Sequence, residues 1–360
     1  MTAATAQPTP RSYSSSTLNR QLRGFMAKSS ISLFGLLLLS VFLMPLGYMV
    51  ATAFKDDAEL SAQNAPLWPA SAKTYTYQGQ EYPLYLVPTE QGVKELALVA
   101  PHREDSDFVD PANPDAGAFT WQGRYRTLSP VYNFAPKFKN FPEAWQQVQF
   151  GLLFRNTFVL AIISTIGTLL SCIAVAYGFA RFDIPGKNIL FVILISTIVL
   201  PAQVTIIPLF IFFTKIGWTG TWLPLLVPAF FANAYDVFLL RQYFLTIPRQ
   251  LDEAAMIDGA SPLRILWSVI IPQAIPAITA VTLFHFFFVW NDYFSPLVYL
   301  VGKEDLYPIS VGLGKLVGTF SRFPGLAMAS ALMAIALPVV IFFLAQRQFM
   351  QGVVITGVEK

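Results

Sequence analysis

Residues 253–272, EAAMIDGASPLRILWSVIIP, combine charge, small side chains and a glycine in a pattern suited to binding another protein. Glu253 can form a polar contact with a partner. Ala254 and Ala255 are small helix formers, which let a second surface come close. Gly259 can end a helix in a left-handed cap. The chemistry that these residue types indicate is docking rather than catalysis.

The residues around this segment supply start signals for two short helices. Pro248 suits the first turn of a helix, where its missing N–H is not needed. Asp252 follows in an early turn, where the positive end of the helix dipole favours an acid. Ser261 and Pro262 fit the N-cap and first position of a second helix, which we expect to continue into the next apolar run. The residues alone fit a docking helix–turn–helix and a plain amphipathic connector equally well.

The composition indicates that this segment lies between membrane spans. Hydrophobic residues make up 54% of the 360 residues and charged residues 12%, whereas soluble domains average roughly 25% charged residues. Six stretches without Asp, Glu, Lys or Arg reach the roughly 20 residues that cross a bilayer as a helix. These stretches are 29–54, 156–180, 188–214, 216–235, 265–291 and 323–346. The expected fold class is therefore an all-α integral membrane protein with six transmembrane helices.

Lys and Arg in the flanking segments indicate the orientation of the spans. Residues 1–28 contain four basic residues and no acid, whereas 55–150 contains 8 Lys or Arg against 12 Asp or Glu. With the first segment in the cytoplasm, the remaining cytoplasmic segments contain Arg181, Lys187, Arg241, Arg249, Arg264, Arg347 and Lys360. We therefore expect a multi-pass protein of the inner or plasma membrane with both termini in the cytoplasm.

Local composition divides the chain further. Residues 1–28 are rich in Ser, Thr, Gln and Pro and have little to bury, which predicts disorder. The stretches 74–87 and 93–100 alternate in a way typical of short strands, although a mostly irregular cap is the alternative. The expected organisation is a disordered cytoplasmic tail (1–28), transmembrane helix 1 (29–54), an extracytoplasmic β-containing insertion (55–150), a core of helices 2–6 (151–350) with a cytoplasmic loop (246–272), and a cytoplasmic tail (351–360).

The spacing of the docking residues carries a family resemblance. Glu253-Ala-Ala, Gly259 and the Val269, Ile271 and Pro272 positions resemble the EAA loop of ABC importer permeases, and Asp258-Gly-Ala matches its common extended form. Val269 and Ile271 stand where Ile and Leu are more usual. Segments 238–248, 289–300 and 346–360 resemble the sugar-importing branch, and more narrowly the maltose-type second permease subunit. The resemblance covers helix 1 and roughly 150–360, but not the insertion.

This resemblance implies an importer permease fold and a division of labour between subunits. Glu253 would be a polar contact to a cytoplasmic ATPase subunit, Ala254 and Ala255 the close-approach face, and Asp258 and Gly259 the turn. The implied partners are the ATPase subunits, a second homologous permease subunit, an extracytoplasmic solute-binding protein, membrane lipid and a sugar or oligosaccharide. No nucleic acid is implied. ATP-driven rocking of helices 2–5 would alternate the access of the pore.

No motif for chemistry within the chain itself is present in the sequence. The segment 312–315, GLGK, lacks the Gly five residues before its Gly-Lys pair and the Ser or Thr after it that a phosphate loop needs. The lone Cys172 excludes an intrachain disulfide and a cysteine metal cluster. We therefore expect no catalytic residue, no metal and no cofactor, and ATP hydrolysis in a separate subunit.

Three residues are candidates for the substrate path. His285 is ionisable and falls in a span, which indicates either a pore residue or, equally, a neutral histidine bonded to a neighbouring helix. Asn291 and Asp292 follow at the outer end of that span, where interfacial anchoring and loop capping are favoured over contact with sugar hydroxyls. Asp236, near the cytoplasmic end of its span, is expected to have a structural role.

Other classes of membrane protein remain as alternatives. An ABC importer for another small solute would have the same features. A secondary transporter would need ionisable groups within its spans for ion coupling, and the sequence offers only His285 and Asp236. A membrane-bound enzyme is disfavoured because no convergent polar set is visible.

Overall fold

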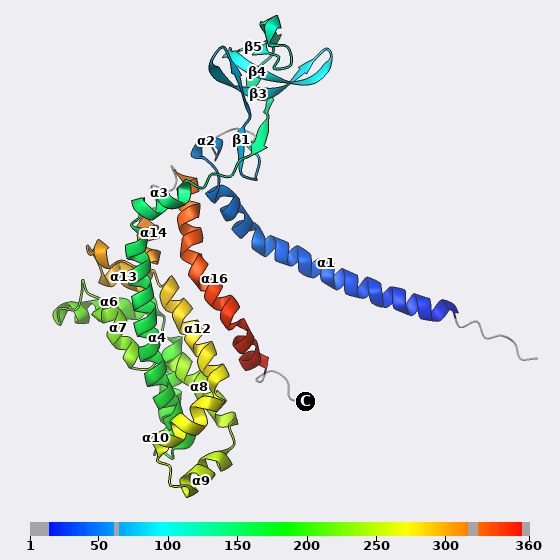
Figure 1. The fold of residues 1–360 in the computed structure, drawn as a ribbon. Helices are drawn as coiled ribbons and strands as arrows, with labels where there is room; N and C mark the ends of the chain where they lie inside the picture. The colour runs from blue at the N-terminus through cyan, green and yellow to red at the C-terminus, as the bar shows by residue number, and fades with distance from the viewer. Residues whose placement is uncertain (1–13, 61–64, 316–322, 355–360) are drawn as a thin grey trace, which may run out of the picture.

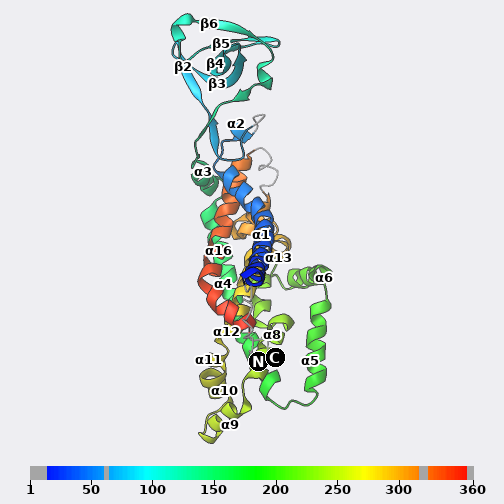
Figure 2. The same ribbon diagram turned by 90° about the vertical axis from the view of Figure 1, so that its right-hand side faces the viewer.

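The computed structural model describes residues 14–60, 65–315 and 323–354. It is an elongated molecule with a helical bundle at one end and a lobe of β-strands at the other (Figures 1 and 2). The helices are α1 (Ser14–Ala53), α2 (Asp57–Leu60), α3 (Asn140–Gln147), α4 (Phe150–Arg181), α5 (Lys187–Ser196), α6 (Ala202–Lys215), α7 (Leu223–Leu226), α8 (Ala234–Thr246), α9 (Arg249–Ile257), α10 (Pro262–Ile265), α11 (Ile271–Gln273), α12 (Ile275–Asn291), α13 (Phe294–Tyr299), α14 (Ile309–Lys315) and α16 (Pro324–Val354).

Four helices in the described residues are long and apolar enough to cross a membrane, or up to six if two bent helix pairs each count as one span. The four are Leu22–Ala53, Phe150–Arg181, Leu223–Thr246 and Pro324–Arg347. The bent pairs are Lys187–Val199 with Gln203–Lys215, at 98°, and Pro262–Gln273 with Ile275–Asn291, at 82°. Two of the expected spans are therefore broken rather than straight.

Prolines explain both breaks. Leu200 has an extended backbone immediately before Pro201, as the steric clash with a following proline ring requires. The second break lies at Ala274, between Pro272 and Pro276, where the chain leaves helical geometry before α12 begins. A helix cannot run through such positions without losing backbone hydrogen bonds.

The fourth expected span, 216–235, is displaced toward the C-terminus, because the candidate span is Leu223–Thr246. The sequence-based boundary stopped before Asp236, since a charge is costly in lipid, and Arg241 follows five residues later. In the structure, the Arg241 guanidinium lies over the Phe191 ring, 4.0 Å from its centroid. This cation–π contact stabilises a charge within the helix.

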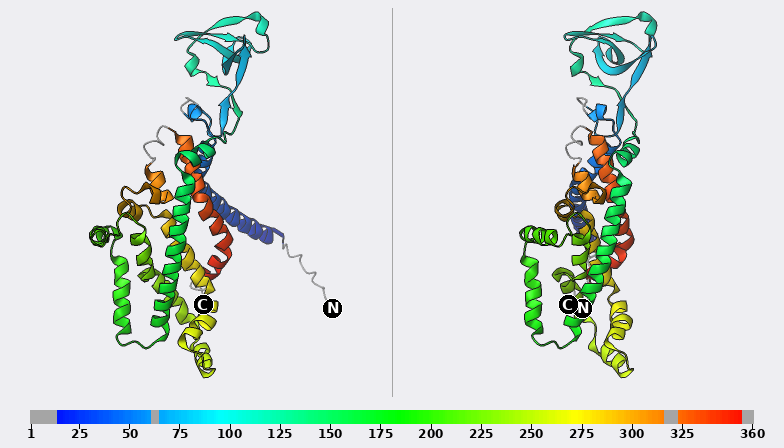
Figure 3. Two further views of the ribbon diagram at one scale, coloured as in Figure 1. Left: turned by 60° about the vertical axis from the view of Figure 1, so that its left-hand side comes forward. Right: turned by 90° about the vertical axis from the view of Figure 1, so that its left-hand side faces the viewer.

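The first helix also begins earlier than expected. α1 starts at Ser14, so residues 14–28 are helical rather than disordered, as a continuation of the apolar helix that follows them. Residues 1–13 and 355–360 of the two expected tails lie outside the described residues. Figure 3 shows α1 leaving the bundle at a steep angle, and its contacts with α16 lie near its C-terminal end. None of its most apolar window is buried.

The bundle is centred on α4, which packs against both α8 and α12. One core cluster lies near the α9–α10 end and includes Val237, Leu240, Phe244 and Ile270. Another lies toward α13 and α14. Buried polar groups of α4 bind the connection that precedes α14, because Asn156 Nδ2 donates to Tyr307 O at 3.1 Å and Thr157 Oγ1 accepts from the Ile309 N–H at 2.7 Å.

The strands form an antiparallel lobe between α2 and α3. They are β1 (Ala70–Ala72), β2 (Thr74–Tyr77), β3 (Gln80–Thr89), β4 (Gly92–Pro101), β5 (Asp105–Val109), β6 (Ala118–Gln122), β7 (Ser129–Pro130) and β8 (Tyr132–Phe134). The main sheet has the order β2-β3-β4-β5-β6, with β7 beside β3, and β1 pairs with β8 near the bundle. Positive φ angles at Gln78 and Gly79 allow the tight β2–β3 turn.

A buried asparagine at the start of α3 joins α3, α1 and α16. Asn140 Nδ2 donates to Ala53 O and Lys55 O, both at 2.8 Å, and so satisfies carbonyls at the end of α1. Gly325 of α16 lies so close that an added Cβ would sit 2.8 Å from that nitrogen. The close approach fixes the three elements at one point.

We predict that Asn140→Ala destabilises this junction. Two buried carbonyls would lose their donor, which costs about 2 kcal/mol in total. The change should appear as a lower midpoint of thermal unfolding in detergent. Gln146→Ala, at an exposed position on the same helix, is the matched control. Equal midpoints for the two variants would contradict this role.

Candidate functional site

The segment 246–272 folds as two short helices around a sharp turn. α9 follows Pro248 and ends in a Schellman motif, in which the Ala260 N–H donates to Ala255 O at 2.9 Å and the Gly259 N–H donates to Met256 O at 3.0 Å. Gly259 has φ +78°, a conformation that costs other residues energy. The local geometry therefore follows from the capping residues.

The second helix begins at the expected residues but does not continue straight. Ser261 Oγ accepts from the Arg264 N–H, and Pro262 is the first residue of α10. A single π-helical turn, Leu266–Ile270, follows, and α11 ends at the 82° bend before α12. Sequence reasoning had extended this helix into the next span. The paired prolines beside Ala274 prevent that.

The outer surface of this helix–turn–helix is exposed and partly apolar. Glu253 and Ala254 are exposed, whereas Ala255 is half-buried and packs against the core cluster beneath it. Large apolar side chains are exposed as well, with Ile257 86% exposed at the end of α9 and Trp267 62% exposed in the π-helical turn. Asp258 and Gly259 lie in the exposed turn. The segment 246–272 therefore exposes a charged group, small residues and apolar side chains.

A buried ion pair connects α9 to the end of α4. Arg181 Nε lies 2.7 Å from Asp252 Oδ2, and both side chains are almost fully buried. The same guanidinium donates from Nη2 to Ile247 O at 2.9 Å, and the Tyr177 hydroxyl donates to Pro262 O at 3.1 Å. The start of α9 and the start of α10 are therefore both held by the last turns of α4.

Sequence reasoning missed this pair. In the sequence, Arg181 indicates only the orientation of the membrane spans. Asp252 indicates only the early turn of a helix, where the helix dipole favours an acid. Burial raises the pKa of the Asp252 carboxyl above its ordinary value, and the charges of Arg181 and Arg249 offset part of that rise. No local pattern in the sequence points from one residue to the other.

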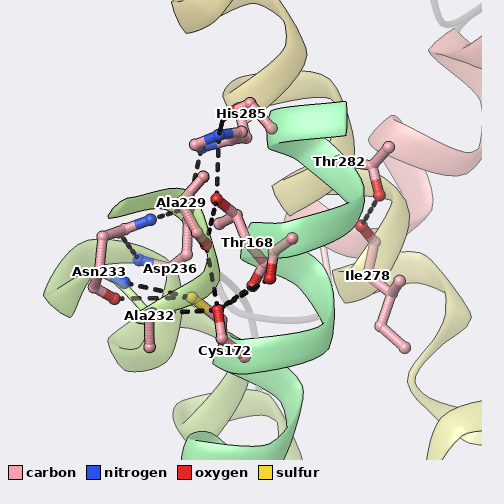
Figure 4. A network of polar contacts seen from close by, with 12 residues as sticks. Thr168, Cys172, Ala229, Ala232, Asn233, Asp236, Ile278, Thr282 and His285 are labelled. Carbon is pink, nitrogen blue, oxygen red and sulfur yellow. Dashed lines mark hydrogen bonds and ion pairs between the residues drawn. The ribbon is translucent and has the colours of Figure 1, made fainter. Parts of the chain in front are cut away.

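A second polar cluster lies inside the bundle, where α4, α8 and α12 meet (Figure 4). His285 Nε2 is 3.0 Å from both Ser164 Oγ and Thr168 Oγ1, and His285 Nδ1 is 3.5 Å from Asp236 Oδ2. A carboxylate can only accept hydrogen bonds, so Nδ1 is the ring nitrogen that lies where it can donate to Asp236. Whether Nε2 donates to the two hydroxyls of α4 or accepts from them depends on the tautomer of the ring.

The capping residue of α8 completes this cluster. Asn233 Oδ1 accepts from the Asp236 N–H at 2.8 Å, and its Nδ2 donates to Asp236 Oδ2. The Asn233 N–H in turn donates to Cys172 Sγ at 3.4 Å. Asp236 thus lies in the first turn of α8, within the candidate span Leu223–Thr246, rather than near its cytoplasmic end. Its partnership with His285 was not foreseen.

The structure separates the three expected substrate-path residues. A cavity of about 250 Å³ is lined by His285 and Asp292. Asn291 instead lines a different cavity, of about 670 Å³, between α12 and α16. Asp292 has a capping role, since its Oδ1 accepts from the Ser295 N–H at 3.2 Å. A further cavity of about 780 Å³ is lined by Asn233, Asp236 and His285.

The described residues hold no group of three His, Cys, Asp or Glu side chains that could bind a metal ion. The two sites are an exposed surface at one end of the bundle and a set of polar groups that line cavities within it.

Comparisons with known proteins agree with this description. Residues 167–353 match the family model described as binding-protein-dependent transport system inner membrane component. The osmoprotective compounds uptake permease protein GgtD of Synechocystis is 33% identical over 61% of this chain and 74% of its own length. The sn-glycerol-3-phosphate transport system permease protein UgpE of Yersinia pestis is 30% identical over 72% of this chain and 89% of its own.

A solved structure extends the likeness to the fold. A chain of a bacterial ABC transporter involved in the import of the acidic polysaccharide alginate superposes with a TM-score of 0.62, over 95% of this chain and 99% of that chain, at 22% sequence identity. The family match includes the helix–turn–helix, α8, α12 and most of α16. This chain belongs to the family of binding-protein-dependent transport system inner membrane components.

Proposed function

We propose that this chain is a permease subunit of an ABC importer for a sugar or oligosaccharide. It would form half of an alternating-access pore that partner ATPase subunits drive. The observation that carries the proposal is the exposed helix–turn–helix of α9 and α10, which is connected to the bundle by the buried Arg181–Asp252 pair. Such a surface suits a subunit that receives motion from another protein.

The name of one similar protein supports the substrate class. UgpE is named for the transport of sn-glycerol 3-phosphate, a small molecule with hydroxyl groups. The relative named for osmoprotective compounds leaves an importer for another small solute as the alternative. A sugar is the choice that also agrees with the motifs at 238–248, 289–300 and 346–360.

The coupling role follows from which residues face outward. Glu253 and Ala254 lie on the exposed surface of α9, and Asp258 and Gly259 form the turn beside it. In the proposed complex, this surface docks in a groove of an ATPase subunit, with Glu253 as its polar contact. Ala255 faces the core instead, so its small size would allow α9 to pack closely on the bundle.

Movement of the docked surface would reach the bundle through α4. Arg181 binds the start of α9 and Tyr177 binds the start of α10. The same helix, α4, contacts His285 through Ser164 and Thr168. His285 and Asp292 line one cavity and would belong to the substrate path. Asn291 would line the separate cavity between α12 and α16.

We also propose the membrane arrangement that the charge pattern predicts. Counting each bent pair as one span gives six spans, with both termini in the cytoplasm. The helix–turn–helix and the strand lobe lie at opposite ends of the molecule (Figure 2), as a cytoplasmic loop and an extracytoplasmic insertion require. The lobe would contact the solute-binding protein, and a second permease subunit would complete the pore.

We predict that Glu253→Lys uncouples the importer. A reversed charge on the docking surface should lower ATP-dependent uptake at least about tenfold, because a like charge at an interface is costly. Folding should persist, since the side chain is exposed. The measurements are uptake and co-purification of the ATPase. Asp183→Lys, at a 96% exposed acid after α4, is the control, and normal uptake by Glu253→Lys would contradict the role.

We predict that Arg181 and Asp252 are strongly coupled. Arg181→Ala leaves a buried carboxylate without its partner and should destabilise the protein by about 3 kcal/mol. The double variant Arg181→Met with Asp252→Leu should recover much of that loss, because it leaves no buried charge. Thermal unfolding of the purified protein tests this. Simple additivity of the single effects would show that the pair is not an interacting unit.

The buried His285–Asp236 pair is also the observation that favours a secondary transporter, since ion-coupled carriers need ionisable groups within spans. We predict that uptake by reconstituted vesicles stops when ATP is omitted and continues when a protonophore is added. Uptake that follows the proton gradient without ATP would replace the importer assignment.

A further inference from the structure

We propose that the cavity of about 780 Å³ beside α8 and α12 is a subsite for an uncharged sugar ring. The proposal rests on the importer function proposed above and narrows its substrate class. Three polar side chains would bind hydroxyl groups, and three aromatic side chains would contact the C–H faces of the ring. The polar side chains are those of Asn233, Asp236 and His285. The aromatic side chains are those of Tyr235, Phe284 and Phe288.

The polar wall suits hydroxyl groups. A sugar hydroxyl both donates and accepts, and it needs partners of both kinds. Asp236 accepts and Asn233 can do both. Both ring nitrogens of His285 already contact Asp236 or the α4 hydroxyls, so a sugar hydroxyl would have to replace one of these contacts. Ionisable side chains within membrane spans are expensive and commonly mark a substrate pathway. Asp236 and His285 lie within spans and line this cavity.

The polar groups are held before any ligand arrives. Asn233 fixes the Asp236 carboxylate and backbone, and Ser164 and Thr168 contact the far nitrogen of His285. These contacts come from three different helices (Figure 4). A site whose side chains are already ordered loses less entropy on binding.

Part of the lining is aromatic. Phe288 is 69% exposed, and Tyr235 and Phe284 are also exposed although the surrounding bundle is apolar. Rigid aromatic rings provide large contact areas at low entropy cost, and a Tyr adds a polar group at its edge. A sugar ring has apolar C–H faces and polar hydroxyl groups. The aromatic rings would contact the C–H faces, and the carboxylate and the amide would bind the hydroxyl groups.

Charge decides against an anionic cargo. His285, Asn233 and Phe288 also line the cavity of about 250 Å³, which continues to Asp292. In the part of the chain that the structure describes, the two linings contain the carboxylates Asp236 and Asp292 but no Lys or Arg. A phosphate or uronate would meet two carboxylates and no Lys or Arg. The pathway in this subunit is therefore built for neutral polyhydroxylated molecules.

The test measures sugar binding by the purified importer complex without its solute-binding protein, so that the binding protein's own selectivity does not contribute. The probes are maltose, trehalose and sn-glycerol 3-phosphate. Binding of each probe is detected by saturation-transfer NMR. We expect transfer to the two neutral sugars and not to the phosphate. Asp236→Asn should weaken sugar binding about tenfold, because it removes a charged hydrogen-bond acceptor. Phe288→Ala should weaken it about fivefold.

The matched control is Phe42→Ala, at an exposed phenylalanine on α1, far from the cavity. It should leave sugar binding as in the unaltered complex. Sugar binding that is equal in all variants, or transfer to the phosphate alone, would overturn the subsite. ATP-dependent uptake of the same neutral sugars by the complete importer is measured in parallel. If the subsite is wrong but the proposed function is right, this uptake persists. Lack of uptake of every probe would overturn both.

Discussion

The buried ion pair between Arg181 and Asp252 is the interaction on which the arrangement of this chain depends. It removes two charges from water, and only the near contact of 2.7 Å and the hydrogen bond to Ile247 O offset that cost. The pair fixes the position of α9 on α4. Without it, the exposed surface of the helix–turn–helix would be joined to the bundle mainly by apolar packing, which resists sliding less than a directional contact does.

Helix α4 makes polar contacts with other elements at three levels along its length. Arg181 lies at one end, Thr168 contacts His285 in the middle, and Asn156 and Thr157 bind the connection to α14 at the other end. Each of these buried groups has a partner on another element, as a low-dielectric interior requires. α4 therefore connects the helix–turn–helix, the cavity and the opposite end of the bundle. In the proposed importer, a displacement at one end would reach the others through this one helix.

The sequence predicted the local features of this site and not the distant ones. Gly259, Ser261 and the prolines beside them act within a few residues, so their effect on α9 and α10 could be derived from spacing alone. The pairs Arg181–Asp252 and Asp236–His285 join helices that are far apart in the chain, and no periodicity records them. The bend at Ala274 was missed for another reason. An unbroken apolar run indicates the length of a span, but its prolines decide whether that span is one helix.

The bend also determines which helices can move together. α9 and α10 are fixed to α4, whereas α12 is separated from them by the 82° change of direction. In the proposed importer, α4 can thus follow the docking surface while α12 follows it less closely. Their polar contact is His285, whose ring nitrogens face hydroxyls of α4 on one side and Asp236 of α8 on the other. Any difference in movement between these helices must change the contacts of that ring. Because His285 also lines both cavities, such a change would alter the polar wall that the sugar meets, so the coupling motion and the affinity for cargo would be linked at one residue.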